Sequence, residues 1–78
     1  MEFRRGELVV CTAGRENERL MCVIAFDGEY VYLCDGKERK LNNPKRKNPK
    51  HVTKTDRVIA DSMFVTDRAL RKALSKDV

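Results

Sequence analysis

The chain has 78 residues, of which 41% are hydrophobic and 37% are charged, and its net charge is +5. A chain of this length forms one small domain and buries only roughly 60–65% of the surface that its unfolded form exposes. The charged fraction is well above the ~25% of an ordinary domain. Size and composition therefore leave little room for a deep catalytic cleft.

The positive charge is concentrated in one segment. Residues 37–57 contain nine basic and two acidic residues, a net charge of +7, whereas the rest of the chain carries −2. A near-neutral body with one strongly basic segment predicts a localised anionic partner. The alternative interpretation of such a run is a solvated surface that keeps the protein soluble.

Cysteine and histidine usage argues against a metal site. Cys11, Cys22 and Cys34 each lie in an apolar stretch and form no C-x-x-C pair, and His51 is the only histidine. This pattern is typical of free cysteines in the core of a protein from a reducing compartment. The longest apolar run, residues 20–26, is shorter than the ~20 residues that cross a bilayer, and no targeting segment is visible. We therefore expect a cytoplasmic protein without a metal or cofactor.

Three apolar runs in the first half predict β-strands. Residues 8–12 and 30–34 are rich in β-branched and aromatic side chains, and residues 20–26 are apolar on both faces. Runs of this length and composition favour strands over helices. The second run is expected to be the most buried strand.

Two Asp-Gly pairs predict the turns that follow these strands. Asp27-Gly28 separates the second run from the third, and Asp35-Gly36 precedes a segment of alternating bulk and charge at residues 37–41. Asp-Gly suits a two-residue type I′ hairpin, in which both central residues need a positive φ. We therefore predict an antiparallel meander in which residues 37–41 form the fourth strand.

A basic arm is predicted at residues 42–50. It begins with a turn, and residues 45–50 contain no apolar side chain, so the arm is expected to be an exposed loop. Residues 51–55 then predict a fifth strand. Five short strands joined by tight turns indicate a closed or partly closed barrel, which leaves few free sheet edges.

The last part of the chain predicts a short helix. Thr66 is a good N-cap, and Asp67 suits the positive end of a helix. Residues 56–62 are expected to form at most one helical turn. One side of the helix is apolar, at Leu70, Ala73 and Leu74. We expect this helix to plug one end of the barrel, and the alternative is a helix that binds a partner.

Residues 6–15 and 19–24 form a strand, a turn with basic residues around Gly14, and a second strand. This arrangement resembles the KOW motif, and Gly14 matches its central glycine, where a positive φ is tolerated without a Cβ clash. The wider stretch, about residues 4–55, is similar to KOW-containing ribosomal proteins of the large subunit in archaea and eukaryotes, of the fourteenth-e and twenty-seventh-e type, and to their small bacterial relatives. The resemblance implies an SH3-like barrel that binds RNA or sits on a ribosome. Glu18-Arg19 stands where the family often has Lys-Gly.

We therefore predict a mainly β protein: a small SH3-like five-stranded barrel over residues 1–55, with its basic arm at 42–50, and a C-terminal helical segment over 56–78. The expected function is that of a non-enzymatic RNA-binding protein, associated with ribosomal RNA and possible neighbouring ribosomal proteins. It would recognise structured RNA mainly through phosphate contacts. The residues predicted to contact RNA are Arg15, Arg19, Arg39, Lys40, Lys45, Arg46, Lys47, Lys50, His51 and Lys54.

Other functions are less well supported by the sequence. No serine or cysteine has an evident base to activate it, and no phosphate-binding glycine loop is present, so no catalytic residue or small-molecule substrate is predicted. Tyr30 and Tyr32 share one strand face and are either barrel wall or base-stacking residues. The main alternative is a protein-interaction module that docks a partner of the translation or transcription machinery through a barrel edge or the helix. Binding to a membrane surface is disfavoured, because the arm lacks apolar anchors.

Overall fold

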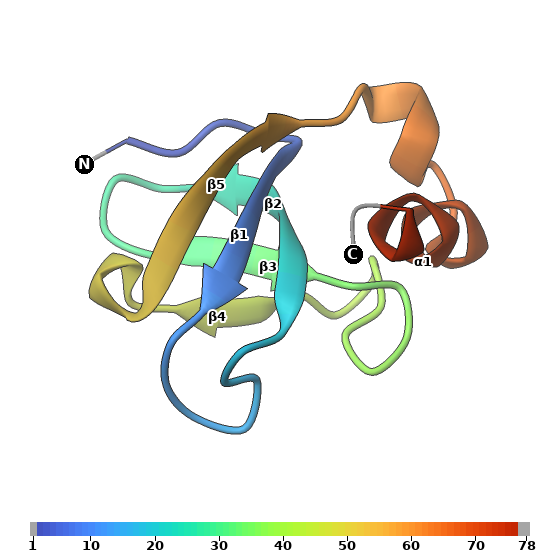
Figure 1. The fold of residues 1–78 in the computed structure, drawn as a ribbon. Coiled ribbons are helices and arrows are strands. Elements are labelled where there is room, and N and C mark those ends of the chain that lie inside the picture. Colours follow the sequence, from blue (N-terminus) through green and yellow to red (C-terminus); the bar gives the residue numbers. More distant parts are fainter. Residues whose placement is uncertain (1, 77–78) are drawn as a thin grey trace.

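A computed structural model describes residues 2–76 as one five-stranded antiparallel sheet with a short helix after it (Figure 1). The predicted mainly β fold with a C-terminal helix is confirmed. The spatial order of the strands is β4-β3-β2-β1-β5. The strands are β1 (Glu7–Cys11), β2 (Leu20–Phe26), β3 (Val31–Cys34), β4 (Lys45–Lys47) and β5 (Val52–Val58). The helices are the 3-10 helices η1 (Pro49–His51) and η2 (Asp61–Phe64), and the α-helix α1 (Asp67–Ser75).

The expected closure into a barrel is not found. The ladders join β4 to β3, β3 to β2, β2 to β1 and β1 to β5, and no ladder within residues 2–76 joins β4 to β5. Register shifts at Leu8/Val9 and Val23/Ala25 mark irregularities at which strands bend. β4 has only three residues and continues into η1 after Asn48. The sheet therefore curls but stays open at its two edges.

The fourth strand lies later in the chain than predicted. Residues 37–41 form a bend and turn, and β4 is part of the arm that was expected to be a loop. The backbone N–H groups of Asp35 and Gly36 both donate to the carbonyl of Arg39, at 3.0 and 3.1 Å. Because these groups are used inside the loop, the chain turns back instead of extending a ladder from residue 37.

The two Asp-Gly turns form by a different mechanism from the predicted type I′ geometry. Among residues 2–76, the only residues other than glycine with a positive φ are Glu18 and Asp56. Asp27 and Asp35 therefore lack the required backbone conformation. Instead, the Asp27 carboxylate accepts backbone N–H groups at 2.8 and 2.6 Å, and the Asp35 carboxylate accepts two at 2.9 Å. Each aspartate thus closes its own turn through its side chain.

The two faces of the sheet bury two separate cores. Successive side chains on a strand point to opposite faces, so Leu8 and Cys22 belong to one core and Val9 and Val23 to the other. The first core consists of Phe3, Val9, Cys11, Met21, Val23, Val31, Leu33 and Val52. The second core consists of Leu8, Cys22, Cys34, Phe64, Leu70 and Leu74. Both faces of β2 thus contribute to a core, as its sequence indicates, but Ala25 is exposed, and β3 rather than β2 is the most completely buried strand.

The helix covers a face of the sheet rather than an end, which corrects the predicted plug. Leu70 and Leu74 of α1, with Phe64 of η2, provide half of the second core. Figure 1 shows α1 beside the sheet, next to the loop that leaves β3. Thr66 is the predicted N-cap, and its Oγ1 accepts the N–H of Ala69 at 3.0 Å. The helical turn expected within residues 56–62 lies later in the chain, at η2, because residues 56–58 belong to β5.

The three cysteines are free and buried, as predicted for core residues. Burial raises the pKa of Cys22 and Cys34 to about 12 and also raises the pKa of Cys11. These thiols are therefore neutral at physiological pH and behave as small apolar groups. The described part of the chain contains no helix with the length and apolar character that a bilayer-spanning segment requires.

Candidate nucleic-acid interface

The register of β4 decides where its basic side chains point. Lys45 and Lys47 lie opposite Leu33 and Val31, which belong to the first core, and Arg46 lies opposite Tyr32. Residues directly opposite each other in a ladder share a face. The two lysines of β4 therefore point toward the first core, and the arginine points to the other face of this edge strand.

Lys47 is buried in an ion pair. Its Nζ donates to Glu16 Oε1 at 3.0 Å and to the carbonyl of Ala13 at 2.8 Å. The side chains of Lys47 and Glu16 are only 7% and 9% exposed. Burial raises the pKa of Glu16, but the hydrogen bond and charge of Lys47 lower it by more, so the net pKa lies below its usual value. Lys47 therefore holds the 12–19 loop on the sheet and is not available to a ligand.

Two more of the predicted contacts are neutralised by carboxylates. Arg19 Nη1 lies 3.3 Å from Asp35 Oδ2 and 3.1 Å from Glu38 Oε2. Lys54, on the far edge strand β5, lies 3.4 Å from Glu7 Oε2. Each pair links two loops or strands, so these cations have a structural role that the sequence did not reveal.

The Asp35 carboxylate is a junction between loops. Burial raises its pKa, but the N–H groups of Arg39 and Lys37 and the guanidinium of Arg19 lower it by more, so the net pKa lies below the usual value. The side chain of Asp35 is 8% exposed. Its charge is therefore already matched by donors and does not repel an anion strongly.

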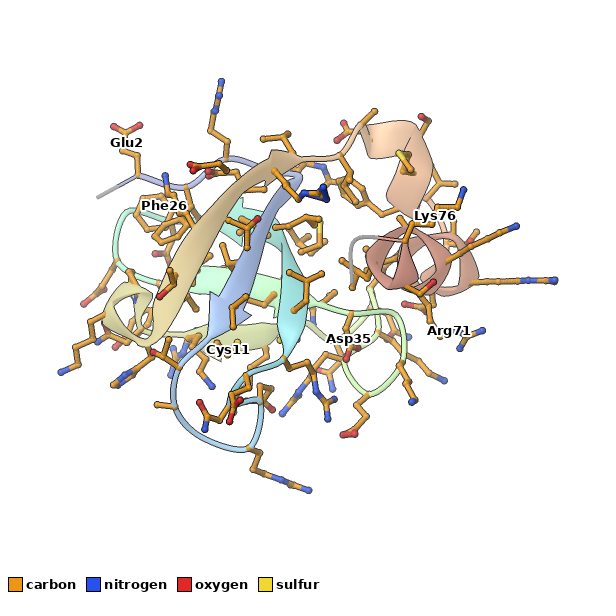
Figure 2. The ribbon with its side chains drawn as sticks, viewed as in Figure 1. Glu2, Cys11, Phe26, Asp35, Arg71 and Lys76 are labelled. Atoms are coloured by element: carbon orange, nitrogen blue, oxygen red, sulfur yellow. The ribbon has the colours of Figure 1, made fainter. Side chains whose placement is uncertain are left out.

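Five of the six remaining predicted lysines and arginines form a set that we call the basic edge, and the sixth, Lys40, lies at its margin. Within residues 2–76 these side chains are in no ion pair, and each is exposed or half-buried. Figure 2 shows nitrogen-tipped side chains on this side of the molecule, around β4 and the loops that flank it. The basic edge consists of Arg15, Arg39, Lys45, Arg46 and Lys50.

The 12–19 loop brings the basic edge together. Its Thr12 N–H donates to the carbonyl of His51 in η1 at 2.8 Å. Arg15 and Arg39 line one open hollow with Glu16 and Glu38. Gly14 has a φ of +81°, which agrees with the turn expected at this position. The loop thus connects η1, β4 and the loop after β3.

Two predicted residues lie at the margin of this set. Lys40 is exposed and in no ion pair within the described residues, but its backbone carbonyl accepts the thiol of Cys34 at 3.2 Å. His51 is half-buried at the end of η1, and its carbonyl is used by the 12–19 loop. No group of three or more acidic, histidine or cysteine side chains in residues 2–76 is placed to hold a metal ion.

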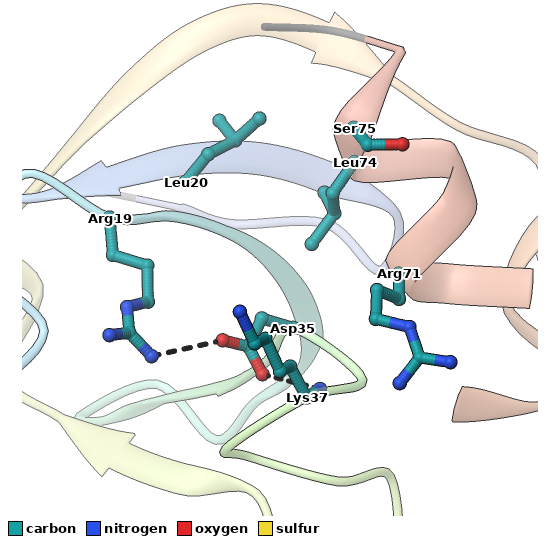
Figure 3. Close-up of a pocket in the computed structure, with 7 residues that line it drawn as sticks. All are labelled: Arg19, Leu20, Asp35, Lys37, Arg71, Leu74 and Ser75. Atoms are coloured by element: carbon teal, nitrogen blue, oxygen red, sulfur yellow. Dashed lines mark hydrogen bonds and ion pairs between the residues drawn. The ribbon is translucent and has the colours of Figure 1, made fainter. Parts of the chain in front are cut away.

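Sequence reasoning did not anticipate a hollow beside α1. It has a volume of about 390 Å³ and lies between the start of β2, the Asp35 turn and the last turns of the helix (Figure 3). Leu20 and Leu74 supply its apolar surface, and the cations Lys37 and Arg71 stand at its rim. The hollow thus brings Lys37 and Arg71 together with Arg19 around one apolar surface. The complete lining is Arg19, Leu20, Asp35, Lys37, Arg71, Leu74 and Ser75.

A scan against models of known protein families finds no match for this chain, and a search of curated proteins finds none either. The relation to KOW proteins therefore depends on the sequence pattern of residues 4–55 and stays a prediction.

Proposed function

We propose that this chain is a non-enzymatic RNA-binding protein that holds the phosphate backbone of structured RNA along the basic edge. The observation that carries the proposal is the set of five exposed or half-buried cations in no ion pair within residues 2–76. Lysine and arginine that are not matched by acids neutralise phosphates and release condensed counterions. The KOW resemblance agrees with this function and suggests ribosomal RNA, in the cytoplasm, as the partner.

The layout of the basic edge suits shape recognition better than base reading. Lys45 and Arg46 lie on opposite faces of one edge strand, and Lys50 follows on η1. The cations of the basic edge therefore lie on both sides of an edge strand and do not line a pocket for bases. Contacts of this kind position a protein on an RNA helix without reading its sequence.

Salt dependence tests the proposal directly. Binding to a structured RNA is measured over a range of salt concentrations. With three to five phosphate contacts, the slope of log K against log salt is expected to be about −2 to −4. A slope near zero would overturn the proposal.

A triple charge reversal locates the surface. Lys45→Glu, Arg46→Glu and Lys50→Glu together are expected to weaken RNA binding by on the order of 100-fold and to abolish co-sedimentation with ribosomes. The matched control also reverses three exposed cations, Arg68→Glu, Lys72→Glu and Lys76→Glu, which lie on or directly after α1, and it is expected to bind RNA much more tightly than the triple variant. Unchanged co-sedimentation of the triple variant would favour the alternative, a protein-interaction module, for which the hollow beside α1 is a candidate surface.

A further inference from the structure

Three planar side chains lie on one face of the β3–β4 edge. Tyr32 is directly opposite Arg46 in the ladder. Tyr30 precedes Tyr32 by two residues and so lies on the same face. The guanidinium carbon of Arg46 lies 4.6 Å from the centroid of the Tyr30 ring. The two tyrosines are half-buried and Arg46 is exposed, so this face offers flat groups that solvent can reach.

The turn before β3 holds the two rings in place. The hydroxyl of Tyr32 donates to Asp27 Oδ2 at 2.9 Å. The other oxygen of the same carboxylate accepts the N–H of Tyr30. The backbone N–H of Tyr30 is the largest of the contacts that lower the pKa of Asp27. Because the carboxylate is bound by several neutral donors, it orients the tyrosines and stays ionised and exposed at one end of this face.

Packing does not account for these two tyrosines. Neither tyrosine belongs to either hydrophobic core among the described residues. Cys34 lies two residues beyond Tyr32 on the same face, and it packs under α1 in the second core. The helix thus covers one end of this face and leaves the tyrosine end open. Part of each tyrosine ring therefore stays exposed outside both cores, where a flat ligand can reach it.

We propose that Tyr30, Arg46 and Tyr32 form a stacking site for an unpaired nucleobase that leaves an RNA stem held by the basic edge. This rests on the proposed function and deepens it. Tyrosine rings and arginine guanidinium planes stack on bases of any identity. Arg46 belongs to both sets, so the stacking site adjoins the basic edge.

Two RNA stems that differ by one base test this proposal. One stem carries a bulged adenosine, and the other carries an abasic nucleotide at the same position, so their phosphates are identical in number. The intact protein is expected to bind the first stem about tenfold more tightly, the lower part of the range for one stacked base. Tyr30→Leu is expected to remove this preference and to leave binding of the abasic stem unchanged. Tyr30→Phe keeps the ring at the same position and is expected to retain the preference.

A second readout needs no variant. The chain has two tyrosines and no tryptophan, so its intrinsic fluorescence reports only on Tyr30 and Tyr32. The bulged adenosine is expected to quench this emission and the abasic stem is not. Equal affinity for the two stems, with equal emission, would overturn the stacking site while the phosphate-binding function stood. Failure to bind either stem in a salt-dependent way would overturn the proposed function itself, and the stacking site with it.

Discussion

The base of the 12–19 loop and the basic edge use the same kinds of side chain for different purposes. At the base of the loop, Lys47 and Arg19 are bound to Glu16, Asp35 and Glu38 and join segments far apart in the chain. Along the basic edge, no such partner is present within the described residues. A lysine-rich segment is thus divided between cations that build the surface and cations that the surface presents.

The largest expected effect is the loss of folding stability when Lys47, one of the paired cations, is replaced. Lys47→Met leaves the Glu16 carboxylate buried without its partner, and breaking a buried pair in this way costs about 3 kcal/mol or more of unfolding free energy. Lys45→Met, two residues away on the same strand, removes an unpaired cation and is expected to change stability by about 0.5 kcal/mol or less. Urea denaturation of the two variants measures both values. Equal stability of the two would mean that the buried pair has no structural role.

Lowering the pH is expected to have a smaller effect on stability, through the carboxylates that bind the paired cations. The folded protein lowers the pKa of Glu16 and Asp35 below their usual values of 4.5 and 3.8. A carboxylate of this kind contributes stability that is fully present above its unfolded pKa and is lost as the pH falls through its folded pKa. Stability is therefore expected to be constant near neutral pH and to fall below about pH 4.5.

Urea midpoints measured from neutral to acidic pH check this dependence. Glu16→Gln removes one of the contributing carboxylates, so its profile is expected to be flatter than that of the unaltered chain. A parallel fall in both proteins would show that the Lys47–Glu16 pair does not contribute to acid sensitivity.

The sequence predicts the strands and the start of the helix, but it does not predict which cations are paired and which are exposed to a ligand. The apolar runs around Val9, Val23 and Leu33 predict the first three strands, because burial of whole runs depends on local composition. The helix start at Thr66 is equally local. By contrast, nothing in the run Lys45-Arg46-Lys47 distinguishes a buried lysine from an exposed one. Both lysines point to the same face of the sheet, so the difference arises from Glu16, which pairs with Lys47 and lies 31 residues away from it in the chain.

The loop after β3 was mispredicted for the same reason. Residues 37–41 have a strand-like alternation, but Asp35 binds the N–H groups of Lys37 and Arg39 and the side chain of Arg19. The turn also packs closely on the helix, since a Cβ on Gly36 would lie 2.3 Å from the carbonyl oxygen of Asp67. These contacts join three distant segments, so no pattern within residues 37–41 indicates them.

The smallest expected effect is a difference in the salt dependence of RNA binding between variants of Lys50 and Lys54. Both are exposed lysines that the sequence predicts to contact RNA. Lys50 is on η1 and in no ion pair among the described residues, whereas Lys54 is bound to Glu7 and to the carbonyl of Glu2. The Nζ of Lys54 also lies 4.9 Å from the centroid of the Phe3 ring. Lys50→Gln is therefore expected to make the slope of log K against log salt less steep by about 1, the contribution of one phosphate contact. Lys54→Gln is expected to leave the slope unchanged.

Paired salt titrations of the two variants with the same RNA stem give this result, and the unaltered chain provides the reference slope. Both substitutions remove one positive charge, so a general electrostatic attraction would shift the two slopes equally. An unequal shift requires a contact at Lys50 itself. A larger change for Lys54 would move the RNA surface to β5 and the N-terminal segment, where the cation would have to leave Glu7 before it reached a phosphate.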